Sequence, residues 1–260
     1  KLLKNIKIIQ SIVSAGLGYF TMAIIMTATP LHMHRVNKFT LFETSIVIQL
    51  HVIGMFLPSL FSGDLIKRFG NTNIIYAGVG ILFLSILTNT LFDFYYSYML
   101  GLILLGIGWN FLFVSGSSLL VVSYEEKDRF TAQGLNDFIV FSTQGIGSLS
   151  AGFLLYFSNW AVINLLCVPL LIIVLIVSMF AARHNTSLQS ITLDGCVQLT
   201  DEAFVHLGRG AKHATLVAAQ GCGKLTNGGF GPLARGCKHL KALNLSYCGG
   251  VNNETLIVVA

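Results

Sequence analysis

Residues 95–122 read YYSYMLGLILLGIGWNFLFVSGSSLLVV, without one charged side chain. A bilayer core about 30 Å thick is crossed by about 20 mainly apolar residues in an α-helix, so this stretch is long enough to span a membrane. A strand is excluded because the stretch is too long, lacks two-residue alternation, and would leave backbone polar groups unpaired in lipid. The stretch therefore predicts a transmembrane helix.

Further stretches of the first 183 residues pass the same length test. The predicted spans are 8–29, 44–62, 73–92, 95–122, 134–157 and 160–182. Composition agrees, because 54% of the residues are hydrophobic and 10% are charged, whereas soluble domains have roughly 25% charged residues. We therefore expect residues 1–183 to form an all-α transmembrane six-helix bundle surrounded by membrane lipid.

The net charge of +5 indicates membrane topology and not nucleic-acid binding, because the basic residues stand at the ends of apolar runs and gather on no one face. A cytoplasmic N-terminus places only Arg35 and Lys38 outside. It places inside Lys1, Lys4, Lys7, Lys67, Arg68, Lys127, Arg129 and Arg183. We expect a multi-pass protein of the cell (inner) membrane with both termini cytoplasmic. Because the first residue is not Met, we also expect the chain to begin inside a longer protein.

Small residues and prolines are placed where helices pack or bend. Small residues let helices approach closely, and the predicted spans contain Gly16, Gly18, Gly78, Gly80, Gly106, Gly108, Gly145, Gly147, Ser148 and Gly152. Pro30, Pro58 and Pro169 lie inside spans or near their ends, where proline ends or kinks a helix.

A glycine-bounded loop follows the second span and reads GDLIKRFG from Gly63 to Gly70. It resembles the short cytoplasmic loop between the second and third helices of each half of the major facilitator superfamily, roughly G-x-L-x-D-R-x-G. Lys67 occupies the acidic position and Asp64 stands three residues early, which weakens any transfer of the family's charge-relay role. We expect Gly63 and Gly70 to permit a tight turn that Lys67 and Arg68 hold on the cytoplasmic side.

Two other stretches resemble the second six helices of certain bacterial members of that superfamily. They read EEKDRFTAQGLNDF at 125–138 and MTATPL at 26–31. The resemblance covers residues 1–183 and implies one half of a transporter, because the family fold has two six-helix halves with the solute between them. It implies transport of a small solute by alternating access, with a second six-span half as partner.

Polar groups at the middle of a span are costly in lipid and are therefore candidates for a solute cavity. By depth these are Gln49, His51, Trp109, Asn110 and Gln144. Gln49 and Asn110 can donate and accept hydrogen bonds, and Trp109 offers a stacking face with one N–H donor. For the Gln and Asn side chains the alternative is an inter-helix hydrogen bond.

His51 is the one ionisable group deep in a predicted span. An imidazole can carry a proton near physiological pH, so His51 is a candidate for coupling transport to protons. The alternative is a neutral histidine bonded to a neighbouring helix, because no carboxylate within the membrane is available to pair with it.

Asp137 lies about one turn inside the fifth predicted span, near the cytoplasmic interface. Water, Lys67 or Arg68 can compensate its charge there. We expect a structural gate contact, with direct binding of the solute as the alternative.

After Arg183 the composition changes and a 26-residue period begins, marked by Cys196, Cys222 and Cys248. The positions eight, five and three residues before each cysteine are Leu188, Ile191 and Leu193, then Ala214, Val217 and Ala219, then Leu240, Leu243 and Leu245. Phe204, Phe230 and Leu256 follow eight residues after.

This register is similar to the cysteine-containing leucine-rich repeats of substrate-binding F-box proteins, over residues 187–260. The resemblance implies about three 26-residue repeats, the last truncated, in a short α/β solenoid. Each repeat would contribute a strand, a turn and a helix, with Leu, Ile and Cys filling a shared interior where cysteine packs as a small hydrophobe.

Two functions remain open. The first is solute transport by the six-span region, and the second is a protein-binding module in which the repeats recognise a partner and the spans are an anchor. We expect no enzyme, cofactor or metal, since no nucleophile with its base, paired carboxylates or metal-ligand spacing converge. Because the two parts resemble unrelated families and meet at Asn185 and Thr186, a chimera, a fusion or an assembly error is a further explanation.

Overall fold

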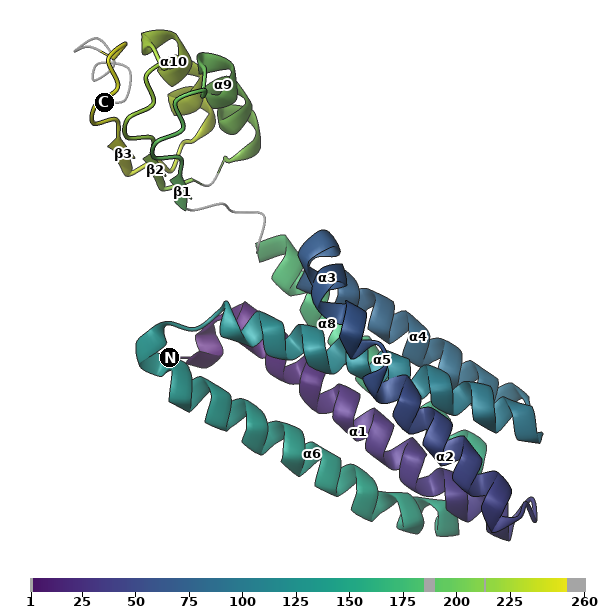
Figure 1. The fold of residues 1–260 in the computed structure, drawn as a ribbon. Coiled ribbons are helices and arrows are strands. Elements are labelled where there is room, and N and C mark those ends of the chain that lie inside the picture. Colours follow the sequence, from purple (N-terminus) through teal and green to yellow (C-terminus); the bar gives the residue numbers. More distant parts are fainter. Residues whose placement is uncertain (1, 185–189, 213, 252–260) are drawn as a thin grey trace. The chain divides into compact units, whose positions relative to one another are not determined.

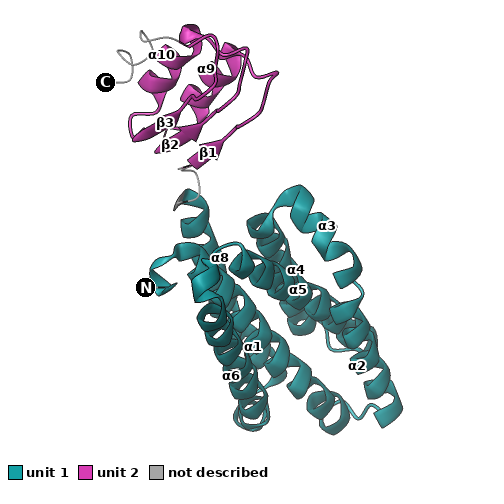
Figure 2. Cartoon of the chain, turned by 60° about the vertical axis from the view of Figure 1, so that its left-hand side comes forward, with its two compact units in different colours: residues 1–183 teal, residues 184–260 magenta. Residues whose placement is uncertain are grey.

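The computed structural model describes residues 2–184, 190–212 and 214–251 and divides the chain into two compact units, residues 1–183 and 184–260 (Figures 1 and 2). Each unit has its own hydrophobic core. The predicted ends of the repeat region and the repeat positions Leu188 and Leu256 lie outside the described residues, as does Lys1.

The first unit is helical throughout. Its α-helices are α1 (Ile6–Arg35), α2 (Leu41–Phe56), α3 (Ser59–Phe69), α4 (Asn71–Leu91), α5 (Tyr95–Val121), α6 (Arg129–Phe157), α7 (Trp160–Leu166) and α8 (Val168–His184). Short 3-10 helices stand at Leu2–Lys4 and Glu126–Asp128. Counting α2 with α3 and α7 with α8, the described residues give six segments long and apolar enough to cross a membrane, as predicted.

The second predicted span is wrong in detail. The helix α2 ends at Phe56, inside the predicted span, and α3 begins at Ser59. Pro58 stands at the break, where it lacks the N–H that would continue the helix. Gly63 lies inside α3, so it makes no turn. The chain reverses at Gly70 alone, whose φ of +83° is the conformation that glycine tolerates. The sixth span is also interrupted, at Cys167.

α1 is the most buried of the six membrane-capable segments in the described residues. It packs on α6 along one side and on α5 along another, with further contacts to α2 and α7, and Figure 1 shows it between α6 and α5. Its most apolar stretch is 72% buried, whereas that of α6 is 17% buried. Pro30 does not end α1, which continues to Arg35. The bundle is therefore built on the contact between α1 and α5, with α6 packed on α1 and with α2 and α4 packed on α5.

Glycines allow the closest helix contacts. A Cβ added at Gly106 of α5 would lie 2.6 Å from the His51 carbonyl oxygen of α2, and one at Gly108 would lie 2.7 Å from the Leu82 side chain of α4. The predicted packing role therefore holds at these sites. It is wrong for Gly80, Gly145 and Gly152, where an added Cβ would meet nothing within 4 Å.

The second unit is a small repeating α/β structure. Its elements are β1 (Ser190–Thr192), α9 (Asp201–Gly210), β2 (Leu216–Ala218), α10 (Asn227–Gly236) and β3 (Ala242–Asn244). The strands form one parallel sheet in the order β1-β2-β3, and the register pairs Ile191 with Val217 and Val217 with Leu243. Figure 2 shows α9 and α10 on the same side of the sheet. Each residue thus pairs with its equivalent one period later.

The periodic cysteines are not equivalent. Cys222 and Cys248 are buried, and their thiols donate to the carbonyl oxygens of Leu193 at 3.2 Å and Ala219 at 2.9 Å, each in the preceding repeat. Cys196 is exposed, which corrects the expectation that all three fill the interior. Burial also raises the pKa of the Cys222 thiol, which favours its protonated, apolar form.

Candidate functional site

Four aromatic rings from three helices meet in the first unit. We call Tyr19 of α1, Trp109 and Phe113 of α5 and Phe141 of α6 the aromatic cluster. The Tyr19 ring lies edge-on to Trp109 at 4.9 Å and to Phe113 at 5.1 Å between centroids, and Trp109 and Phe113 stack at 5.3 Å. Phe141 lies 6.3 Å from Tyr19. Trp109 and Phe113 are four residues apart, so one face of α5 presents both.

The aromatic cluster runs from the interior to the surface. Trp109 is 4% exposed, Tyr19 and Phe113 are half-buried, and Phe141 is 61% exposed. The indole N–H of Trp109 is buried without a hydrogen-bond partner among the described residues. A buried N–H usually has a partner, because leaving it unpaired costs about 1–3 kcal/mol. The arrangement can hold a flat ring by stacking and offers one donor.

Gln144 and Gln49, two other residues predicted to line a solute cavity, keep their side-chain amides available to a solute. Gln144 is half-buried on α6, three residues from Phe141 and so on the same side of that helix. Gln49 is exposed on α2. The described residues give neither side chain a hydrogen bond.

The Asn110 side chain is hydrogen-bonded to the bent second span. Its amide donates to the Met55 carbonyl at 2.8 Å and to the Ser59 hydroxyl at 2.6 Å, and its oxygen accepts from Ser62 at 2.7 Å. All three partners flank Pro58, where the helical hydrogen-bond ladder is interrupted and carbonyls need other donors. This is the inter-helix hydrogen bonding that was the alternative to solute binding.

His51 is fully buried between α2 and α5. Its Nδ1 lies 2.8 Å from the Leu102 carbonyl oxygen, which can only accept, so Nδ1 carries the hydrogen. Nε2 is buried with no partner among the described residues. One bond to a carbonyl oxygen of α5, with no carboxylate partner among the described residues, matches the alternative of a neutral histidine bonded to a neighbouring helix.

The charged residues of the predicted loop and gate do not meet. Lys67 lies 3.8 Å from Asp64 on the exposed surface of α3, and Arg68 lies over the Phe69 ring at 5.2 Å. Asp137 is exposed and accepts a hydrogen bond at 3.1 Å from its neighbour Asn136. It stands more than two turns into α6, which begins at Arg129, because α6 starts before the predicted span.

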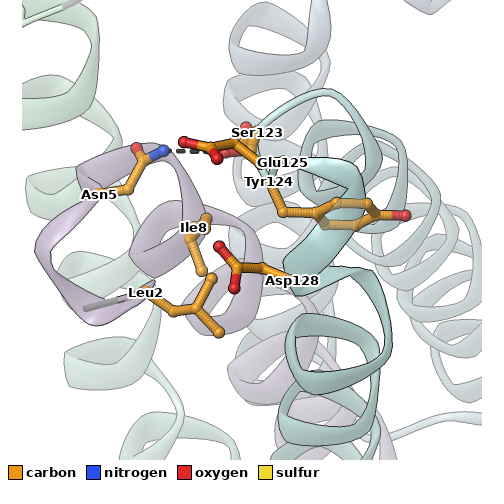
Figure 3. Close-up of a pocket in the computed structure, with 7 residues that line it drawn as sticks. All are labelled: Leu2, Asn5, Ile8, Ser123, Tyr124, Glu125 and Asp128. Atoms are coloured by element: carbon orange, nitrogen blue, oxygen red, sulfur yellow. Dashed lines mark hydrogen bonds between the residues drawn. The ribbon is translucent and has the colours of Figure 1, made fainter.

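A polar pocket lies at the start of the first unit (Figure 3). It is lined by Leu2, Asn5, Ile8, Ser123, Tyr124, Glu125 and Asp128. The Asn5 amide donates to the Ser123 carbonyl at 2.9 Å and so ties the start of α1 to the end of α5. Glu125 pairs with Lys127. Within the described ranges no three His, Cys, Asp or Glu side chains gather as a metal would require.

Sequence reasoning missed a hydrogen-bonded group at the other end of α1. We call His32, Asn37, Asp93, Tyr98 and Trp160 the Asp93 cluster. The Tyr98 hydroxyl donates to the Asp93 carboxylate and lies 2.9 Å from Nδ1 of His32. The Asn37 amide donates to Asp93 at 2.6 Å and to the Tyr98 oxygen at 2.9 Å. Asp93 is exposed, whereas His32 and Tyr98 are buried, so the group leads from the surface inward.

Trp160 of α7 forms the inner wall of the Asp93 cluster. Its ring stacks on His32 at 5.2 Å and 13°. Its N–H donates to the Asn89 carbonyl at 2.8 Å, and Asn89 donates to the Asn164 side chain at 3.1 Å, which fixes the ring. The sequence offered little signal for this group, because His32 lies beyond the predicted first span and Asp93 in a connection.

Comparison with known proteins places the chain in a family. Residues 12–218 match the Major Facilitator Superfamily, a stretch that continues past Arg183 into the second unit. The riboflavin transporter RfnT of Brucella anthropi is 38% identical over 181 residues, which cover 68% of this chain and 44% of that protein. Two uncharacterised transporters of the same type from Bacillus subtilis, YddS and YdeG, are each 32% identical, over 60% and 58% of this chain and 38% and 35% of their own lengths.

The chain thus spans less than half the length of these relatives. With six membrane-capable helices, the matches make it an integral multi-pass membrane protein. The matches support the predicted resemblance to the major facilitator superfamily. The leucine-rich-repeat identity of residues 187–260 stays a prediction.

Proposed function

Because the chain belongs to the major facilitator superfamily, we propose that residues 1–183 form one six-helix half of a transporter that moves a small, planar aromatic solute by alternating access. The observation that carries the solute class is the aromatic cluster, which combines stacking surfaces from α1, α5 and α6 with an unpartnered indole N–H. A similar protein, 38% identical, is a riboflavin transporter, and riboflavin carries a flat ring system of this kind.

Each member of the aromatic cluster has a role in the proposal. Phe141, the most exposed ring, stacks on the solute first, and Tyr19 closes on its edge. Trp109 supplies a hydrogen-bond donor when Tyr19 moves aside. Gln144 and Gln49 supply polar contacts to the solute's heteroatoms. Base–aromatic stacking contributes about 1–3 kcal/mol per ring, so one lost ring is measurable.

Riboflavin binding tests the proposal directly, because stacking on aromatic side chains quenches flavin fluorescence. The full chain in lipid nanodiscs is titrated against riboflavin, and Phe141→Ala is expected to weaken binding about tenfold. Phe153→Ala is the matched control, since Phe153 is also exposed on α6 but lies three turns away, and its affinity should stay within about twofold of the parent.

Trp109→Phe then separates stacking from hydrogen bonding, because it keeps a ring and removes the N–H. We expect weaker binding with unchanged helix content by circular dichroism. Equal affinities for the parent, Phe141→Ala and Trp109→Phe would remove the aromatic cluster from solute binding. A folded chain that binds no riboflavin would contradict the solute class.

A second six-helix half is the proposed partner, and α6 supports this. Outside its contact with α1, α6 exposes Phe130, Phe138, Phe141, Ile146, Leu149, Phe153, Tyr156 and Phe157. A face this apolar must meet lipid or another helix layer. Cross-linking between cysteines introduced on this face in nanodiscs would detect pairing of two chains, and its absence would leave lipid as the covering.

The protein is proposed to lie in the cell (inner) membrane with both termini of the chain in the cytoplasm. Cys196 is a natural reporter, because it is exposed while the other four cysteines are buried. A membrane-impermeant maleimide should label it in inside-out vesicles and spare it in right-side-out vesicles, with Cys196→Ser as the blank. The opposite pattern would invert the topology.

A second function, protein binding by residues 187–260, is favoured by the repeating geometry of the second unit. Its parallel strands pair at a strict 26-residue offset, so Ser190, Leu216 and Ala242 form one exposed row across the sheet. Such rows are the recognition surfaces of solenoid proteins. A binding partner lost on Leu216→Arg and kept on Val197→Arg, an exposed position outside the sheet, would support this function.

A further inference from the structure

The hydrogen atoms of the Asp93 cluster can be assigned from its acceptors. An ionised carboxylate only accepts, so the single Tyr98 hydroxyl hydrogen is directed to Asp93. The Tyr98 oxygen is then an acceptor for His32, and Nδ1 of His32 must carry a hydrogen. This assignment leaves Nε2 as the one basic nitrogen of His32. The described residues give Nε2 no hydrogen bond, and the side chain is 6% exposed.

We propose that the Asp93 cluster is a proton-binding site in which His32 takes a proton from water at Nε2 and becomes an imidazolium. Nδ1–H stays on Tyr98, and release returns the same proton from Nε2 to water. The site binds a proton without any transported solute, so the proposal stands apart from the aromatic cluster.

Two contacts stabilise the imidazolium. The Asp93 carboxylate acts through one hydroxyl group, because Tyr98 bridges it to His32. The Trp160 ring lies face to face with His32, the geometry in which an aromatic face attracts a cation. Asn37 holds the bridge by donating to both Asp93 and Tyr98. A buried charge needs such partners.

The other ionisable groups at this end have partners of their own or face away. On α1, His34 and Arg35 are exposed, and His34 lies 3.0 Å from the Phe39 carbonyl. On α2, Glu43 caps its own helix through Thr40. α7 carries no ionisable side chain. From α5 the group that meets His32 is Tyr98. Asp93 is therefore the counter-charge.

Proton uptake would tie several parts of the bundle together. The Asp93 cluster draws on α1, the α1–α2 connection, the α4–α5 connection, α5 and α7. A charge at His32 strengthens the contacts to Asp93 and Trp160 together, whereas the neutral ring holds both more weakly. The protonation state of one side chain thus sets how firmly this end of the bundle is closed.

Fluorescence of Trp160 reads the site directly, because a stacked imidazolium quenches indole emission. The chain has two tryptophans, so Trp109→Phe leaves Trp160 as the only one, and excitation at the red edge of the indole band avoids the tyrosines. The full chain with this change is reconstituted in nanodiscs and titrated between about pH 4.5 and 8.5. We expect emission to fall with decreasing pH along a one-proton curve. His32→Gln should abolish the fall.

Asp93→Asn supplies a second, milder test, because Asp93 is exposed and its replacement keeps the packed helices in place. Loss of the counter-charge is expected to weaken proton binding about tenfold, which moves the midpoint about one unit to lower pH. His51→Gln and His34→Gln are controls and should leave the curve unchanged. A fall that persists in His32→Gln, or a midpoint that Asp93→Asn leaves in place, would overturn the proposal.

Discussion

His51 and His32 are both buried histidines that join α5 to another helix, and their surroundings differ in one respect that matters. His51 donates to a backbone carbonyl, and the described residues give it no carboxylate, no stacked ring and no route to the surface. His32 contacts a phenol that is bonded to an exposed carboxylate, and it stacks on an indole. The residue type is the same, so the partners decide whether a charge can form.

The regions around the two histidines differ in the same way. Near His51, glycine contacts and the Asn110 amide hold α2 and α5 together through groups that do not titrate. At the Asp93 cluster the helices are joined through groups that do. We therefore expect the middle of the bundle to be insensitive to pH and the end at Asp93 to respond to it.

The largest expected effect is at the α2–α5 contact. Gly106→Leu would force a side chain into the His51 carbonyl, where even a Cβ would come within 2.6 Å, and should lower the free energy of unfolding by about 3 kcal/mol. Unfolding by sodium dodecyl sulfate, followed by circular dichroism, measures this. Gly80→Leu, at a position with open space, is the control, and equal losses for both would refute the close contact.

Asn110→Leu should have the next largest effect. It removes the partners of Met55, Ser59 and Ser62 at the Pro58 break and should cost about 2 kcal/mol. The same unfolding measurement at pH 5.5 and pH 8 should give equal losses, because none of these groups titrates. A loss of stability that changed with pH would contradict the expectation that the middle of the bundle is insensitive to pH.

Tyr98→Phe should cost about 1 kcal/mol at pH 8, since it leaves the buried Nδ1–H of His32 unpaired. At pH 5.5 the loss should be larger, because the imidazolium then also loses its bridge to Asp93. Unfolding curves at the two pH values test this. If the loss were the same at both, the Asp93 cluster would be a structural contact like the one at Asn110.

The smallest effect is expected at Asp137. It is exposed and bonded only to its neighbour among the described residues, so Asp137→Asn should change the free energy of unfolding by less than about 0.5 kcal/mol. A substantially larger loss, restored by a charge swap with Lys67 or Arg68, would support the gate contact predicted from the sequence.

The helical spans could be predicted because apolar length alone decides them. Pro58 also signalled its break, since proline removes a backbone donor. Gly63 was misread as a turn, because a helix accepts an exposed glycine at about 1 kcal/mol and only the φ of Gly70 shows where the chain turns.

The polar sites could be predicted only in part. Span depth identified Trp109, but neither its neighbour Tyr19 nor the partners of Asn110 follow from depth, because helix rotation decides which faces meet. The Asp93 cluster brings together residues from 32 to 160, and each has an ordinary explanation alone. In the second unit the 26-residue register predicted which positions pair. It did not predict that Cys196 is exposed, because Cys222 and Cys248 are each buried against the repeat before them.

The deep burial of α1 is completed late in synthesis, because it depends on helices that follow far along the chain. α1 leaves the ribosome before its main partners α5 and α6, which begin only at Tyr95 and Arg129. At about 5–20 residues per second, α1 waits roughly 3 to 20 seconds for them. During that interval the buried side chains of Ser11 and His32 lack the partners on α5 to which they are hydrogen-bonded in the finished bundle. Until α5 has been made, these polar groups must therefore be satisfied by water, lipid headgroups or the membrane-insertion machinery.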